Sequence, residues 1–144
     1  SSSAFVPFRK ETTMANPSYA LTKHLKSVGF DAAIAAVTES LKAEGFGVLT
    51  EIDIQKTFKA KLDVDHRRYV ILGACNPTLA HRALSADELV GLLLPCNVIV
   101  AEEDEGSMVA IVNPREMFKV VENVDLGPVV DEVDAKLHRV IDSL

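Results

Sequence analysis

The sequence predicts an α+β domain in which a mainly antiparallel sheet of about five strands carries helices on one face. Three observations support this fold class. Five short segments are apolar throughout or alternate apolar with polar residues, as strands do. Apolar residues at helical spacing follow the first segment and recur after the last. The strand-like segments also succeed one another along the chain, and sequential strands usually pair with each other.

The five apolar segments are the expected strands. Residues 46–53 alternate apolar and polar side chains, as a half-buried strand does. Residues 69–75 are mostly apolar, which suits a central strand with both faces covered. The other expected strands are 19–25, 96–103 and 107–112, with a hairpin turn at 104–106 between the last two.

Several segments have the spacing or the capping residues of helices. In 32–44 the apolar residues recur at helical spacing, Asp31 precedes them as a capping residue, and Gly45 supplies a left-handed stop. Further helical turns are expected at 55–62, after Asn76-Pro77, through Leu92 after a capping box at 85–88, after Asn113-Pro114 and at 128–143.

Length and composition indicate one domain with an ordinary core. The chain has 144 residues, of which 48% are hydrophobic and 25% charged, values typical of soluble globular proteins. We interpret residues 1–13 as a leader or extension, Met14 as the native start, and 14–144 as a single domain. Such a length is sufficient for a hydrophobic core without disulfides or metals.

Charge and cysteine content exclude several classes of function. The net charge of −6 argues against binding nucleic acid, which requires clustered Lys and Arg. No apolar run reaches the length of a membrane span, so we expect no membrane partner. Two cysteines in a chain of this size do not form a disulfide framework. We therefore expect a cytoplasmic protein with both thiols reduced.

Residues 69–101 organise the chain, because both cysteines lie at the inner ends of its two apolar runs. Cys75 ends the first run and Cys96 begins the second, after Pro95. If the two strands are antiparallel neighbours, both thiols lie at the same end of the sheet. If the intervening helical segment is a right-handed parallel crossover, the thiols lie at opposite ends.

Three groups of residues together resemble the family known as domain of unknown function 302. They are EGFGV at 44–48 with EIDI at 51–54, YVILGACNP at 69–77, and GLLLPC at 91–96. The resemblance spans roughly residues 19–118. It implies a fold similar to that of the TATA-binding protein, which favours antiparallel neighbours, and it implies a homodimer. It brings no activity, and we interpret the helix at 128–143 as particular to this protein.

The cysteines are the main candidates for chemistry. Cys75 precedes a helix start, whose amides and dipole stabilise a thiolate. The pair could act as redox thiols, ligate a soft metal or haem, or line a ligand pocket. Alternatively, both are small buried hydrophobes, since apolar residues surround them. Their spacing is not that of a zinc site, and we predict no metal site.

The candidate ligand-binding residues come from the two cysteine motifs and from two other positions. His81 could be a base or a ligand one helical turn beyond Asn76, or a partly exposed helix residue. Glu51 shares a strand face with Asp53, and such a pair usually belongs to a solvated face. The full set is Cys75, Asn76, Pro77, His81, Pro95, Cys96 and Glu51.

No nucleotide-binding glycine loop or nucleophile elbow is present in the sequence. The sequence therefore identifies no catalytic residues and no cofactor. The first hypothesis is a non-catalytic module that binds or senses a small molecule near 75–77 and 94–96. The second is a thiol- or metal-dependent redox protein or enzyme that uses Cys75 and Cys96. The third is an interaction protein in which these motifs serve turn geometry alone.

Overall fold

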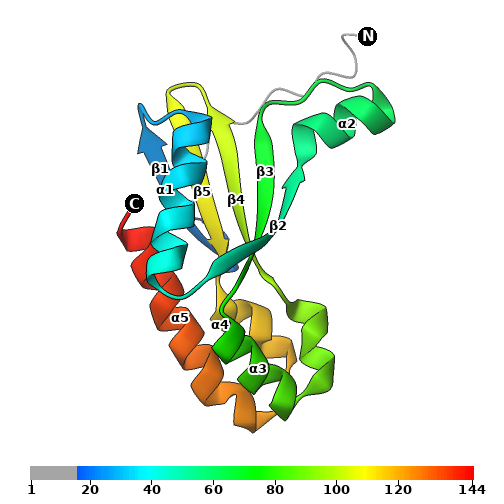
Figure 1. Ribbon diagram of the computed structural model, residues 1–144, viewed down its shortest axis with the longest axis vertical. Coiled ribbons are helices and arrows are strands. Elements are labelled where there is room, and N and C mark those ends of the chain that lie inside the picture. Colours follow the sequence, from blue (N-terminus) through cyan, green and yellow to red (C-terminus); the bar gives the residue numbers. More distant parts are fainter. Residues whose placement is uncertain (1–15) are drawn as a thin grey trace.

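A five-stranded antiparallel sheet in the order β1-β5-β4-β3-β2 forms the centre of the fold (Figure 1). The computed structural model describes residues 16–144, so the predicted leader and Met14 lie outside the described residues. No strand begins or ends more than one residue from its predicted bound, which confirms the predicted fold class. The strands are β1 (Ala20–Lys26), β2 (Gly47–Asp53), β3 (Tyr69–Cys75), β4 (Cys96–Glu103) and β5 (Gly106–Val112).

The two long helices, α1 and α5, pack on one face of this sheet (Figure 1). Shorter helices lie at its two ends. Helix α2 connects β2 to β3 at one end, whereas the connection from β3 to β4 and the one that follows β5 lie at the other. The helical elements are α1 (Phe30–Ala43), α2 (Ile54–Leu62), α3 (Pro77–Ala86), η2 (Glu88–Leu93), α4 (Pro114–Met117), η3 (Phe118–Val120), η4 (Val124–Leu126) and α5 (Gly127–Asp142).

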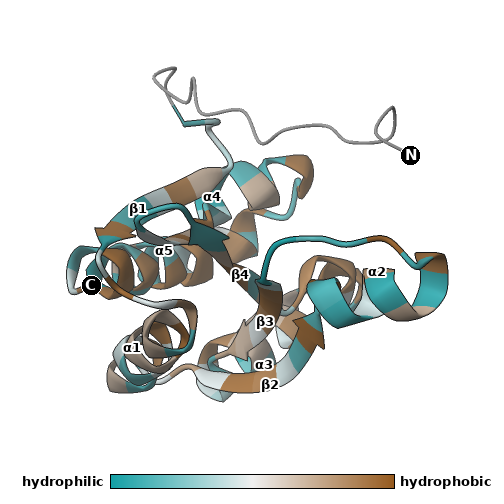
Figure 2. Ribbon diagram, turned by 90° about the horizontal axis from the view of Figure 1, so that it is seen from above, coloured by the Kyte–Doolittle hydropathy of each residue, from teal (hydrophilic) through white to brown (hydrophobic). Residues whose placement is uncertain are grey.

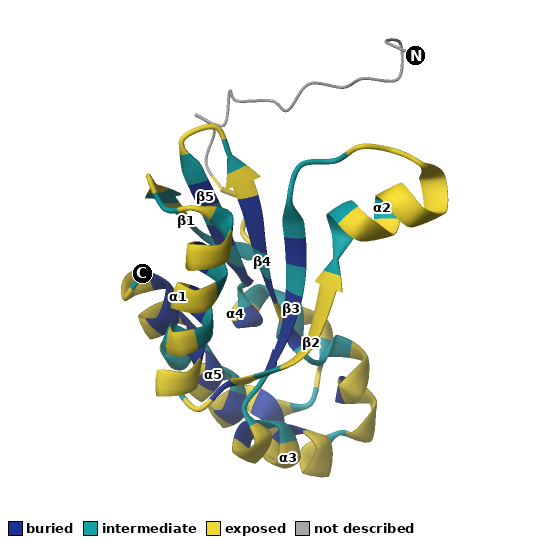
Figure 3. Ribbon diagram, turned by 45° about the horizontal axis from the view of Figure 1, so that its top comes forward, coloured by how far each residue is buried: buried dark blue, intermediate teal, exposed yellow. Residues whose placement is uncertain are grey.

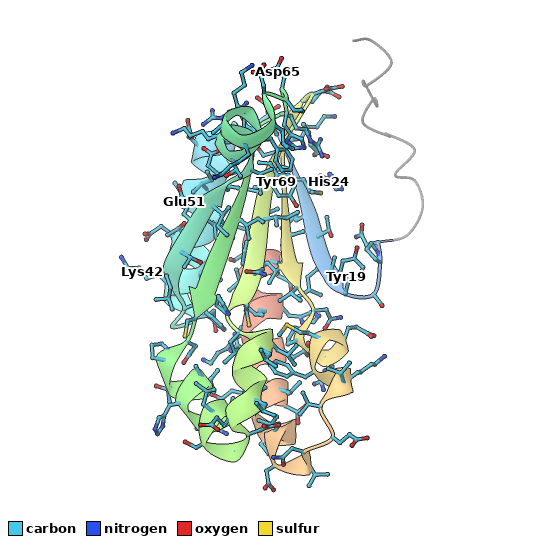
Figure 4. All side chains as sticks on the ribbon, turned by 90° about the vertical axis from the view of Figure 1, so that its right-hand side faces the viewer. Tyr19, His24, Lys42, Glu51, Asp65 and Tyr69 are labelled. Carbon is cyan, nitrogen blue, oxygen red and sulfur yellow. The ribbon has the colours of Figure 1, made fainter. Side chains whose placement is uncertain are left out.

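The sheet has one covered face and one open face. Leu72, Val98 and Ile111 lie side by side across β3, β4 and β5 and are almost completely buried beneath the helices. The neighbouring row on the opposite face contains Ile71 and Ile99, which are only half-buried. Figure 4 views the sheet from this open side, with α1 and α5 behind it. The covered face holds the core of the domain.

Helix α1 begins earlier than its sequence predicts, because a tertiary contact overrides the local cap. Gly29, and not Asp31, is the N-cap residue, and no side chain caps the helix. Asp31 instead pairs with Arg68 at 2.8 Å. The Arg68 guanidinium also lies 4.4 Å from the centre of the Phe30 ring, which is a cation–π distance. Arg68 therefore holds the first turn of the helix.

The capping box predicted at 85–88 is also wrong in its details. Ser85 and Ala86 belong to the last turn of α3. Asp87 caps η2, accepting a hydrogen bond from the Leu89 amide at 3.0 Å. Because α3 continues to Ala86, beyond its buried residues Leu79 and Ala83, the cap lies at Asp87, two positions after the expected Ser85.

Helix α2 is largely exposed, and none of its residues is fully buried (Figure 3). Figure 2 shows that most of it is hydrophilic and that it projects from the remainder of the domain. Its contact with the sheet is aromatic. The Phe58 ring lies 5.3 Å from that of His66, which lies 6.0 Å from that of Tyr69 on β3. These edge-to-face contacts anchor the projection.

The apolar stripe of the C-terminal helix is used within the domain. Five residues of α5 are buried against α1, α3 and the sheet: Val129, Val133, Leu137, Val140 and Ile141. The exposed apolar surface lies elsewhere, including the open face of the sheet. Within residues 16–144, no helix is both long enough and apolar enough to cross a membrane.

Candidate functional site

The two cysteine motifs meet at one end of the sheet. Strands β3 and β4 are antiparallel neighbours, and Ala74 lies directly opposite Cys96. Cys75, the next residue along β3, therefore lies at the same end as Cys96. This register decides between the two arrangements that the sequence left open, and it places both thiols where α3 begins.

Asn76 joins the start of α3 to the end of α1. Its side-chain oxygen accepts a hydrogen bond from the Leu79 amide at 3.2 Å, which confirms the predicted helix cap with Pro77 in the first turn. Its side-chain nitrogen donates to the Glu44 carbonyl at 3.3 Å. Gly45 has a φ of +84°, and a Cβ there would lie 2.9 Å from that nitrogen. Glycine at 45 thus serves both the left-handed turn and the close approach of Asn76.

Gly73 allows a similar close approach between the motif at 69–77 and Pro95 of the motif at 91–96. A Cβ on Gly73 would lie 2.8 Å from Cγ of Pro95 and would also overlap the Thr50 hydroxyl. Thr50 is the register partner of Gly73 and follows an irregularity in the pairing of β2 with β3, between Val48 and Thr50. The Pro95 ring can therefore lie against the β3 backbone only because residue 73 has no side chain.

These contacts border a small, partly open apolar cavity between the sheet end, α3 and α5. Its volume is about 30 Å³. Such a space accommodates about two water molecules by size, but a buried water needs two to four polar partners. The walls are almost entirely apolar, so the cavity favours apolar atoms. It is lined by Phe46, Ala74, Cys75, Asn76, Leu79, Ala80, Ala83, Leu94, Pro95, Cys96, Phe118, Val129 and Val133.

The two thiols on this cavity are in different environments. Both are free, with Cys75 half-buried and Cys96 only 5% exposed. Burial, with a smaller contribution from the neighbouring Cys75, raises the pKa of Cys96 from 9.0 to about 11. Near neutral pH Cys96 is therefore a protonated thiol and a poor nucleophile, because the thiolate is the reactive form. Any thiol chemistry at this site belongs to Cys75.

Four of the predicted site residues line the cavity, namely Cys75, Asn76, Pro95 and Cys96. The other three do not. Pro77 and His81 are exposed on α3, and Glu51 is exposed on β2, where its register partner is Leu72 in the middle of β3. Asp53, on the same strand face as Glu51, caps α2 by accepting from the Lys56 amide at 2.9 Å.

Sequence reasoning missed most of the apolar wall. Phe46, Leu79, Phe118, Val129 and Val133 come from segments far apart along the chain. Only the Gly-Phe pair at 45–46, which belongs to the EGFGV motif at 44–48, points to one of them. Among residues 16–144, no three His, Cys, Asp or Glu side chains gather closely enough to hold a metal ion.

Comparison with known proteins places this arrangement in a family. The model of a family described as "Domain of unknown function DUF302" matches residues 21–144. A similar solved structure is an uncharacterized conserved DUF302 protein from Bacillus stearothermophilus, 29% identical to this chain, with a TM-score of 0.79. That similarity covers 88% of this chain and 98% of the other. No curated protein matches the chain.

The family match corrects one interpretation of the sequence. It extends to residue 144, so α5 belongs to the region that the family shares and is not particular to this protein. The cavity depends on this helix, because Val129 and Val133 of α5 form part of its wall.

The buried thiol predicts a specific loss of stability in alkali. Between pH 9 and 11 the unfolded chain ionises Cys96 whereas the folded chain does not, so the free energy of unfolding falls as pH rises through this window. Each tenfold difference in an ionisation constant corresponds to about 1.4 kcal/mol, so the full loss is about 2–3 kcal/mol. Urea unfolding across this pH range measures it.

Other groups also titrate in alkali, so the informative quantity is the difference between wild type and Cys96→Ala. That difference should shrink by about 2–3 kcal/mol as pH rises from 9 to 11. A difference that stays constant with pH would show that Cys96 ionises normally in the folded protein.

Proposed function

Because the chain belongs to the DUF302 family, whose description states no activity, we propose a function from the site itself: a non-catalytic module that binds or senses a small molecule in the cavity at the cysteines. One observation carries the proposal. The family-like motifs at 44–48, 69–77 and 91–96, distant along the chain, converge on a single apolar cavity. Turn geometry alone would not require the three motifs to share a hollow.

The size of the cavity limits the part of a ligand that it holds. Sites for drug-sized ligands usually measure about 300–1,000 Å³, whereas this cavity measures about 30 Å³. It therefore suits an apolar group of about two or three heavy atoms. The walls favour binding over catalysis, because no imidazole or carboxylate from the described residues lines the cavity.

A second candidate function is a thiol-dependent redox protein or enzyme in which Cys75 is the reacting group. Its support is the placement of both thiols on one cavity, with Cys75 the more accessible of the two. For a metal-dependent form of this function, the described residues offer the thiols of Cys75 and Cys96 at the cavity but no imidazole or carboxylate, since neither His81 nor Glu51 lines it. Either form agrees with a cytoplasmic protein, where thiols stay reduced.

We also propose that the protein is a homodimer, with the open face of the sheet as its interface. The support is the half-buried apolar row of Ile71 and Ile99, continued on the edge strand by Ile52, which is 47% exposed. Sheets with one apolar face usually bury it against another layer. Specific dimers bury roughly 1,200–2,000 Å² in total, so the contact would also involve neighbouring residues beyond this row.

Xenon tests the binding function directly, because dry apolar cavities take up this gas. Methyl NMR under xenon pressure should shift the signals of Leu79, Val129 and Val133 selectively. Ala80→Leu, which adds a side chain at the cavity wall, should weaken those shifts several-fold. Ala36→Leu is the matched control, since Ala36 is exposed on α1. Absence of selective shifts in the wild type would refute the cavity as a binding site.

Alkylation tests the thiol function. One thiol per native chain should react with iodoacetamide near neutral pH, and Cys75→Ser should abolish that reaction while Cys96→Ala preserves it. The physical reason is that Cys96 is buried and protonated. Mass spectrometry counts the adducts, with the denatured chain as reference. If Cys75 reacts no faster than an ordinary free thiol, the redox function loses its support.

Light scattering across micromolar concentrations tests the dimer. The wild type should have twice the mass of the chain, and Ile52→Lys should weaken the association at least tenfold, because a buried unpaired charge is costly. Leu49→Lys is the matched control on the same strand, at a position that is 66% exposed. A wild type that is monomeric throughout, or equal effects of the two lysines, would rule out this interface.

A further inference from the structure

A second, larger hollow lies beside the cysteine cavity. It lies between the η3–η4 segment and the start of α5, and its volume is about 420 Å³. This outer cleft is within the size range of ordinary small-molecule sites. Its lining is Arg115, Phe118, Lys119, Val121, Glu122, Asn123, Val124, Leu126, Gly127, Val130 and Asp131.

Among residues 16–144, Phe118 alone lines both hollows. It is half-buried at the start of η3 and packs against the core. Helix α5 also borders both hollows. Val129 and Val133 line the cavity, whereas Val130 lines the outer cleft. One phenyl ring and the first turns of α5 thus separate an apolar cavity from a partly polar cleft. The two hollows therefore meet at the Phe118 ring.

The charges of the outer cleft favour a cation. The Arg115 guanidinium is engaged by Asp131 at 2.8 Å and by Asp134 at 3.0 Å. Lys119 pairs with Glu116 at 2.8 Å. Glu122, by contrast, has no ion pair with any described residue, although it lines the cleft. Both cations of the cleft are therefore already neutralised, and one carboxylate is left for a positively charged ligand.

We propose that the two hollows are halves of one site for a small aliphatic amine. The free alkyl end, about two or three carbons, occupies the cysteine cavity past Phe118, and the ammonium group lies in the outer cleft near Glu122. This inference rests on the binding function proposed above and names the ligand class for it. The apolar walls of the cavity favour the alkyl end of the ligand, and the unpaired carboxylate of Glu122 favours its ammonium group.

The test uses three probes of equal chain length: n-butylamine, n-butanol and butyrate. Methyl NMR titrations of the full chain should show n-butylamine shifting both Val133 in the cavity and Val130 or Val124 in the cleft. The amine should bind about two- to fivefold more tightly than the alcohol, as expected for an exposed ion pair. Butyrate should bind most weakly, because its carboxylate would face Glu122.

Two variants separate charge from shape. Glu122→Gln should remove the preference for the amine over the alcohol and leave alcohol binding unchanged. Glu39→Gln, at an exposed position on α1, is the control and should change neither. Phe118→Leu should speed exchange of the amine, because a smaller side chain then separates the hollows. Unchanged amine preference in Glu122→Gln would overturn the assignment of the charge.

The source of the ammonium group is also testable. A lysine side chain has no free alkyl end, so N-acetyl-lysine methylamide should leave the cavity methyl signals unshifted, whereas n-butylamine shifts them. Equal shifts from both probes would indicate a protein lysine and overturn the small-amine assignment. If xenon shifts the cavity methyls but n-butylamine does not, the amine proposal fails and the binding cavity stands. If xenon also fails, both are refuted.

Discussion

The arrangement of the whole site depends on the side chain of Asn76. Its two polar atoms connect different helices, one by capping α3 and the other by bonding the carbonyl of Glu44 at the end of α1. Because both bonds come from a single short side chain, the two helix ends are held at a fixed separation. Gly45 makes that separation attainable, since any Cβ there would collide with the amide. By fixing the start of α3 against the end of α1, Asn76 positions one wall of the cavity.

The chemistry of the site follows from how dry it is. Removing Cys96 from water keeps its thiol protonated well above neutral pH, so burial suppresses the reactivity that a pair of cysteines would otherwise imply. The same apolar walls provide a favourable space for alkyl groups. Charged groups lie outside, beyond Phe118, where they meet solvent and one another. The proposal of an amphipathic ligand rests on this boundary between an apolar interior and a charged exterior.

Sequence reasoning succeeded where the responsible interactions are local. The strands were predicted because alternation along a strand reflects its own two faces, and the Asn76-Pro77 helix start was predicted because a cap bonds an amide three residues away. It failed where a distant residue intervened. The expected cap at Asp31 is instead an ion pair with Arg68. The capping box expected at 85–88 is replaced by a longer α3, after which Asp87 caps η2.

The sequence by itself determined the strand bounds, the helix start at Asn76-Pro77, the left-handed turn at Gly45 and the candidate pair Cys75 and Cys96. Only the tertiary structure decided that both thiols share one cavity, that His81 and Glu51 lie outside it, and that Phe118 separates it from a second cleft. The physical reason is the range of the interactions. Caps and turns involve neighbours along the chain, whereas a cavity wall is assembled from side chains whose proximity depends on strand register and helix packing.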